Sequence, residues 1–196
     1  MGNREDLLAG AKRCLYEKGY GRSTARDIAS ASGVSLAAIG YHFGSKESLL
    51  NLALIEAIGE WGGALAGAVA AAHAASEDPE ERFATVWDEV LKSFAEHRGL
   101  WAAQFEAIAQ VGHAPELKEQ LAAAQKGGRL GLAALFQGLP EVPETEDELA
   151  RGIFYQALLA GLAAQWMAAP ETAPSGRDFL RGLRLVSGSV LAAPAG

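Results

Sequence analysis

Residues 19–49 read GYGRSTARDIASASGVSLAAIGYHFGSKESL, and this stretch decides the fold. Ala29, Gly33 and Ile39 have the spacing of a helix-turn-helix: a small residue where two helices cross, a glycine for the positive φ of the turn, and an apolar anchor beneath the second helix. A generic helical hairpin uses the same residue types. The spacing alone therefore leaves both structures open.

The residues on either side complete a predicted three-helix bundle. Residues 4–18 carry apolar side chains at helical spacing, on which Ile28, Val34 and Phe43 are expected to pack: Leu7, Leu8, Ala11, Cys14 and Leu15. Thr24, three residues before Asp27, forms a near capping box, so a short helix should begin there. Ser35 and Ser45 are expected to cap the next two helices.

Helix signals continue beyond residue 50. Residues 78–81 read Asp-Pro-Glu-Glu and residues 145–148 Thr-Glu-Asp-Glu, each an N-cap followed by acids in the first turn, and residues 175–178 repeat the device less strongly. Residues 138–143 and 170–176 interrupt the pattern with glycine and proline. With its abundant Ala and Leu and only 7 Pro, the chain is predicted to be all-α, with about nine helices.

Charge divides the chain into two parts. The net charge of −7 argues at first against a nucleic-acid partner, because binding a polyanion requires local Lys and Arg. Residues 1–50, however, hold seven Lys and Arg against five Asp and Glu, whereas residues 51–196 hold ten against nineteen. A mildly basic head on an acidic body indicates separate functions, which we assign to domains at 1–50 and 51–196.

The head resembles the DNA-binding part of the TetR family of transcriptional regulators. The residues that carry this resemblance lie within 19–49: Gly19, Thr24, Ile28, Ala29, Gly33, Val34, Ser35, Tyr41, His42, Phe43, Lys46 and Leu49. The remainder matches the family only in outline, as a helical body of suitable length. The resemblance implies a positioning helix at residues 24–31 and a recognition helix at residues 35–41, which lies in the major groove.

The expected DNA contacts follow from that assignment. Leu36, Ala37 and Ala38 should meet base edges, although none can form a bidentate hydrogen bond and a thymine methyl is all they can contact directly. Specificity can therefore also depend on DNA shape, Tyr41 or Arg26. Phosphate contacts are expected from Thr24, Tyr41, His42 and Lys46, although packing for His42 and solvation for Lys46 are alternatives. The complete predicted DNA-binding set is Thr24, Arg26, Ser35, Leu36, Ala37, Ala38, Tyr41, His42 and Lys46.

One position departs from the family pattern. Gly40 lies two residues before His42, at a position where the family commonly has tyrosine. A phosphate or base contact usually credited to that side chain is absent, and Tyr41 is a candidate to replace it.

No catalytic constellation emerges from the sequence. Cys14 lies on the apolar stripe of the first helix and is expected to be buried packing rather than a nucleophile. His73, His97 and His113 are too widely spaced for a two-ligand helical metal site, and no phosphate-binding glycine loop occurs. We therefore expect no enzyme activity, no metal and no cofactor.

The body is expected to bind a small apolar effector. Most of its aromatic residues should be core, but some share helices with polar groups that could anchor a ligand in a mostly apolar cavity. The predicted pocket residues are Trp87, Trp101, Gln104, Phe105, Tyr155 and Gln156.

The final two predicted helices, about residues 146–169 and 176–192, are candidates for a dimer interface. In the first of these helices Ala157, Gly161 and Ala164 keep one side small, so another helix could approach it closely. A symmetric homodimer could read two half-sites about 34–36 Å apart. The N-terminus lacks a secretory pattern, and two glutamines disfavour a membrane-spanning helix over residues 152–170. A single cysteine fits a reducing compartment. A cytoplasmic protein with no membrane partner is therefore expected.

The sequence thus predicts a homodimeric transcriptional repressor that binds double-stranded operator DNA and is released by a small-molecule effector. The helix beginning near Lys46 is expected to transmit the effector signal. One alternative is an activator, or a regulator without a small-molecule effector. The other is an all-helical enzyme or carrier whose first fifty residues merely resemble a helix-turn-helix.

Overall fold

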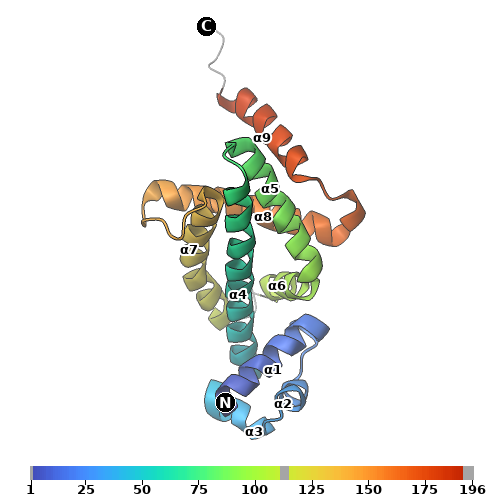
Figure 1. Cartoon of the computed structure of the whole chain (residues 1–196). Coiled ribbons are helices and arrows are strands. Elements are labelled where there is room, and N and C mark those ends of the chain that lie inside the picture. Colours follow the sequence, from blue (N-terminus) through green and yellow to red (C-terminus); the bar gives the residue numbers. More distant parts are fainter. Residues whose placement is uncertain (1, 111–114, 192–196) are drawn as a thin grey trace. The chain divides into compact units, whose positions relative to one another are not determined.

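The computed structural model describes residues 2–110 and 115–191, and this part of the chain is helical without strands. The all-α prediction is confirmed (Figure 1). The elements are α1 (Asn3–Lys18), α2 (Ala25–Ser32), α3 (Leu36–Phe43), α4 (Lys46–Ala75), α5 (Pro79–Glu96), α6 (Arg98–Gln110), α7 (Pro115–Gln137), α8 (Glu146–Ala168), the 3-10 turn η2 (Pro170–Thr172) and α9 (Gly176–Leu191).

Most of the predicted N-cap residues stand at the start of a helix and accept a capping hydrogen bond there. The hydroxyls of Thr24, Ser45 and Thr145 accept backbone N–H bonds at 3.2, 2.9 and 3.3 Å, and the Asp78 carboxylate accepts one at 3.0 Å. Ser35 is the exception: it occupies the N-cap position of α3, but its side chain makes no capping hydrogen bond.

The described chain divides into two compact units. One contains the described residues of Met1–Gly63 and Glu96–Arg129, and the other those of Ala64–Ala95 and Leu130–Gly196. The two units are defined by how compactly their residues pack. The boundary expected after residue 50 instead separates a DNA-binding part from an effector-binding part. That functional boundary stays a prediction.

The first unit contains the head, in which α1, α2 and α3 form one bundle (Figure 1). Leu7, Leu15 and Ile28 are fully buried in its core. A Cβ on Gly10 of α1 would lie only 2.9 Å from the Ser32 Cβ of α2. The two helices therefore approach closely at a residue without a side chain.

Helix α4 presents an inward stripe of apolar residues. Leu50, Leu54, Ala57 and Trp61 are buried and recur three or four positions apart. Residues Lys46–Ala74 are also long and apolar enough, by length and composition, to cross a membrane. A core helix meets the same criterion, so this property alone does not distinguish the two.

Candidate DNA-binding interface

The start of α2 is fixed by a reciprocal capping box. The Thr24 N–H donates to Asp27 Oδ2 at 2.9 Å, and the Asp27 N–H donates to Thr24 Oγ1 at 3.2 Å. Lys18 Nζ lies 2.5 Å from Asp27 Oδ1. These bonds, that from Lys18 above all, hold the pKa of Asp27 well below its usual range. Thr24 is exposed but already engaged in the cap.

The turn between α2 and α3 depends on Gly33. Its φ of 71° lies in the left-handed region, and its N–H donates to the Ala29 carbonyl at 3.0 Å. Ile39, 4% exposed, anchors α3 against the bundle. The roles predicted for Gly33 and Ile39 are confirmed.

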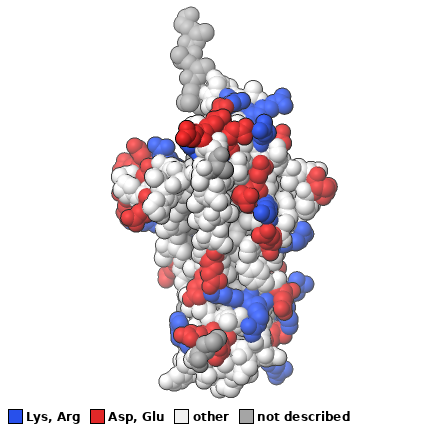
Figure 2. Space-filling model, in the orientation of Figure 1, with Lys and Arg blue, Asp and Glu red and all other residues white. Residues whose placement is uncertain are grey.

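The opposite face of α3 lies open to solvent. Leu36 is 48% and Tyr41 is 87% exposed; Ala37 is exposed and Ala38 half-buried. The helix contains no Lys, Arg, Asp or Glu, and the lower edge of Figure 2, where α3 lies, is largely white. The structure thus presents the residues predicted to meet bases, without charged neighbours on their own helix.

The end of α3 is built from aromatic side chains. His42 is half-buried, with its ring edge-on to Tyr41 at 4.9 Å and to Phe43 at 6.4 Å between centroids. The Arg4 guanidinium of α1 lies 5.3 Å from the centre of the Phe43 ring, a cation–π distance. His42 therefore has packing partners, and its phosphate contact stays a prediction.

Three further predicted contacts lie at helix starts of the same unit. Arg26 and Ser35 are exposed. The Lys46 ammonium donates to the Ser23 carbonyl at 3.2 Å and lies 3.2 Å from a Glu47 carboxylate oxygen. It thus joins the start of α4 to the chain before α2. All nine predicted DNA-binding residues lie on α2, α3, their N-caps or the first residue of α4.

A brace that the sequence pattern does not predict joins the head to α6. The backbone N–H of Gly21, in the turn after α1, donates to Glu106 Oε2 of α6 at 2.9 Å. The same carboxylate would lie within 2.8 Å of a Cβ on Gly19, whose φ is 85°. Glu106 is the one acidic residue of α6, a signal that could have singled it out.

A second contact between α1 and α6 accompanies this brace. The Tyr16 hydroxyl lies 3.4 Å from His97 Nδ1, directly before α6. A Cβ on Gly99 would collide with the Tyr16 carbonyl, so only glycine permits this approach. Helix α6 is therefore packed directly on the first helix of the head.

The predicted pocket residues fall into two separate groups. Trp101, Gln104 and Phe105 lie on α6 in the first unit, where the Trp101 ring meets that of Trp61 edge-on at 5.0 Å. Trp87, Tyr155 and Gln156 lie in the second unit. Their role in binding an effector stays a prediction.

Trp87 is the centre of an aromatic cluster in the second unit. It is fully buried, and its ring centroid lies 4.5 Å from that of Phe179 and 5.0 Å from that of Phe136. Phe136 in turn stacks on Tyr155 at 4.1 Å, and burial raises the pKa of Tyr155. The Trp87 indole N–H has no hydrogen-bond partner among the described residues.

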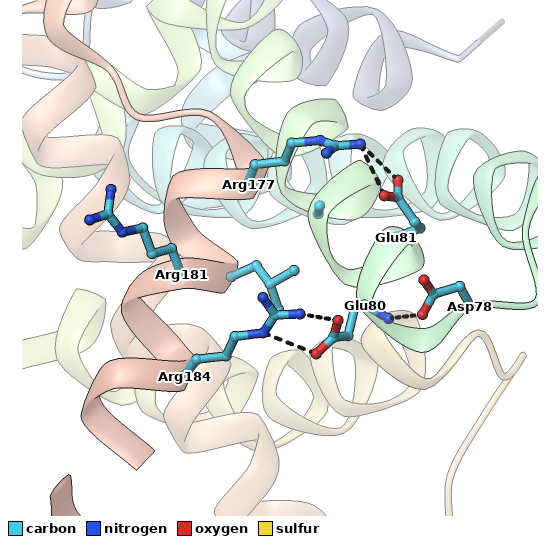
Figure 3. Close-up of a pocket in the computed structure, with 8 residues that line it drawn as sticks. Asp78, Glu80, Glu81, Arg177, Arg181 and Arg184 are labelled. Atoms are coloured by element: carbon cyan, nitrogen blue, oxygen red, sulfur yellow. Dashed lines mark hydrogen bonds and ion pairs between the residues drawn. The ribbon is translucent and has the colours of Figure 1, made fainter. Parts of the chain in front are cut away.

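A surface hollow of about 180 Å³ lies elsewhere in the second unit, between the start of α5 and α9 (Figure 3). Arg177 pairs with Glu81, Arg184 pairs with Glu80, and Arg181 points away from both carboxylates. The hollow is lined mainly by charged side chains and contains none of the predicted pocket residues. It does not fit an apolar effector.

The potential catalytic and metal-binding groups are dispersed. Cys14 is buried as expected, and burial raises the pKa of its thiol. His73 is half-buried, and desolvation, followed by Arg82, lowers its pKa. Within residues 2–110 and 115–191 no group of three His, Cys, Asp or Glu could hold a metal ion, and His113 lies outside the described residues.

Two short helices joined by a left-handed glycine, braced by a third helix and exposing one face of the second, define a helix-turn-helix DNA-binding protein. Family comparisons agree with this class. Residues 7–53 match the bacterial regulatory proteins of the tetR family, and residues 79–181 match the C-terminal part of BetI-type transcriptional repressors. The chain belongs to the TetR family of transcriptional regulators.

Individual relatives resemble the head more closely than the body. The transcriptional repressor AcnR of Corynebacterium glutamicum is 47% identical over 47 residues, which are 24% of this chain and 25% of AcnR, so the match spans about a quarter of that relative. The regulator TtgR of Pseudomonas putida is 28% identical over 182 residues, covering 86% of this chain and 82% of TtgR. A TetR-family regulator from Rhodococcus has the same fold, with a TM-score of 0.66, 21% identity and coverage of 95% and 98% of the two chains.

Proposed function

We propose that this protein is a homodimeric repressor that binds operator DNA through α3 and is released by a small apolar effector. It acts in the cytoplasm, without catalysis or a cofactor. The observation that carries this proposal is the open face of α3 on a helix otherwise anchored by Ile39. No helix of the head bundle covers the face that exposes Leu36 and Tyr41, and this face can enter the major groove of DNA.

The direct test is to sequence the fragments that the purified protein retains from random duplex DNA. The expected result is one palindromic motif with half-sites about one helical turn apart, because two copies of α3 must each enter a major groove. Affinity for this duplex should fall steeply with salt, and Lys46→Ala should reduce the slope of log K against log salt by about one. Recovery of unselected fragments with salt-independent affinity would exclude the proposal.

Dimerisation is supported by exposed apolar side chains on α8 and α9 within the described part of the chain. Phe154 of α8 is 50% exposed, and Leu185 and Val190 of α9 are 67% and 72% exposed. The small residues Ala157, Gly161 and Ala164 of α8 are also exposed, so a second helix can approach closely. Such faces are typical of an interface with a second copy. Sedimentation equilibrium of the chain and of Val190→Glu measures this directly, with a dimer expected only for the unsubstituted chain.

The aromatic cluster around Trp87 is the candidate effector site that we favour. It combines apolar walls with two polar groups that could orient a ligand: the Tyr155 hydroxyl and the Trp87 N–H, which has no partner within residues 2–110 and 115–191. A ligand entering here must displace part of the packing, since Trp87 is fully buried.

The effector signal can reach the head through α6. Only His97 separates α6 from α5, which carries Trp87, and Glu106 of α6 accepts a hydrogen bond from the Gly21 amide of the head. Coupling of about 1–3 kcal/mol would change operator affinity roughly 5–150-fold, and by reciprocity the operator must weaken effector binding equally. Titrating operator affinity against an effector found by thermal-shift screening tests this step, and an unchanged affinity at saturation would exclude induction while leaving DNA binding intact.

A further inference from the structure

The outward face of α3 has an unusual chemical composition. Leu36, Ala37, Gly40 and Tyr41 are all exposed. No atom of the described residues lies within 4 Å of a Cβ built on Gly40, so this part of the helix is a bare, narrow surface. The helix can therefore approach the floor of a groove more closely than one that carries long side chains.

This face lacks the groups that form paired hydrogen bonds with bases. Direct readout of guanine uses Arg or Lys, readout of adenine uses Asn or Gln, and readout of cytosine uses Asp or Glu. None of these six residue types occurs in Leu36–Phe43. Over the surface of Leu36 and Ala37, the one base feature that matches in chemistry is the C5-methyl group of thymine.

Discrimination follows from what each base pair would lose. A guanine or cytosine edge placed against Leu36 would surrender hydrogen bonds to water and receive none in return, which is unfavourable. A thymine methyl placed there would instead remove apolar surface from water on both partners, including part of the 48% of Leu36 that is exposed.

We propose that the operator half-site is read through thymine methyl groups that contact Leu36 and Ala37. This inference rests on the proposed DNA-binding function and specifies its substrate: duplex DNA whose major groove displays thymines at the positions beneath the start of α3. Tyr41, further along the same helix and 87% exposed, marks the other end of the contact surface.

The experiment replaces single thymines of the selected duplex by deoxyuridine, which removes the methyl group and keeps every base-pair hydrogen bond. We expect each contacted position to lose about fourfold in affinity, the ratio that corresponds to burying one methyl-sized group. The same substitutions are measured with Leu36→Ala, which should bind more weakly and lose the discrimination at its own thymine. Ile108→Ala, at a 50% exposed residue of α6, is the matched control and should retain discrimination.

The outcomes separate this inference from the function on which it rests. Tight binding that is indifferent to every deoxyuridine would overturn methyl readout and leave the DNA-binding function intact. An equal loss in the unsubstituted chain and in Leu36→Ala at every thymine would assign the effect to DNA shape and overturn the role of Leu36. Failure to select any duplex would overturn the DNA-binding function itself and this inference with it.

Discussion

The head and the second unit are packed in different ways. In the head, α1 and α2 approach closely at Gly10, around fully buried aliphatic residues such as Leu7 and Ile28. The second unit is instead built around large rings, with Trp87 and Phe94 fully buried. A bundle whose helices meet at a glycine tolerates little added volume at that point, whereas an aromatic core tolerates little removed volume. Substitutions that add volume should therefore destabilise the head most, and substitutions that remove volume should destabilise the second unit most.

The largest expected effect is the removal of the Trp87 ring. Trp87→Ala should lower the free energy of unfolding by about 3–5 kcal/mol, because the cavity would leave Phe136 and Phe179 without their central contact. Urea denaturation measures the loss. Trp87→Phe is the control, with a clearly smaller cost expected, and equal costs for the two variants would contradict the account of an aromatic core.

Added volume should harm the head. Gly10→Ala places a methyl group 2.9 Å from Ser32 Cβ and should cost about 1–3 kcal/mol of the free energy of unfolding. Gly59→Ala, in α4 where a Cβ meets nothing within 4 Å, is the matched control and should stabilise by about 0.5–1 kcal/mol. Stabilisation by both variants would show that α1 and α2 have room to separate.

Local features of the head could be predicted from the sequence because neighbouring residues determine them. The Thr24–Asp27 cap, the left-handed Gly33 and the burial of Cys14 each depend on residues within one or two helical turns. The open face of α3 follows in the same way, because helical periodicity places Ala37 and Tyr41 opposite Ile39 once that residue is buried, with Leu36 at the edge of this face.

Contacts between distant segments could not be predicted in this way. The bond from Gly21 to Glu106 joins residues 85 positions apart, and no periodicity links them. The sequence pattern likewise did not indicate that Trp101 and Trp87 would belong to different compact units, and their common role in binding an effector stays a prediction. Even Ser35, correctly placed at a helix start, makes no capping bond, because residue type favours that bond without requiring it.

A smaller effect is expected from cutting the brace to α6. Glu106→Ala removes the acceptor of the Gly21 N–H and should destabilise this turn by about 0.5–1.5 kcal/mol. Hydrogen exchange at the Gly21 amide should accelerate accordingly. The exposed Glu119 of α7 supplies the control substitution, Glu119→Ala, and the brace would be unimportant if the two variants exchanged at the same rate.

Acid should weaken the start of α2. The Asp27 pKa is depressed in the folded chain, chiefly by the bond from Lys18, so its stabilisation is present above the unfolded value of about 3.9 and is lost as pH falls through the folded pKa. Melting temperature measured against pH should therefore decline in this acidic range less steeply for Asp27→Asn than for the unsubstituted chain. Parallel curves would mean that the cap does not contribute to the acid sensitivity.

The smallest effect is expected at the charged hollow of the second unit. The Arg184–Glu80 pair is more than half exposed on both sides, and Arg184→Ala should cost only about 0–1 kcal/mol of the free energy of unfolding. High salt should erase the difference in urea denaturation. A larger, salt-independent loss would show that this pair, rather than the aromatic cluster, holds α9 in place.

The central claim is that α3 enters the major groove, and directed cleavage of DNA tests it most directly. An iron chelate attached through Ala37→Cys, in a Cys14→Ala background, should cut the selected duplex in two narrow clusters about one helical turn apart. The same reagent attached through Gly59→Cys on α4 should not produce this pattern. Diffuse cutting from position 37, or a pattern shared by both attachment sites, would contradict the claim.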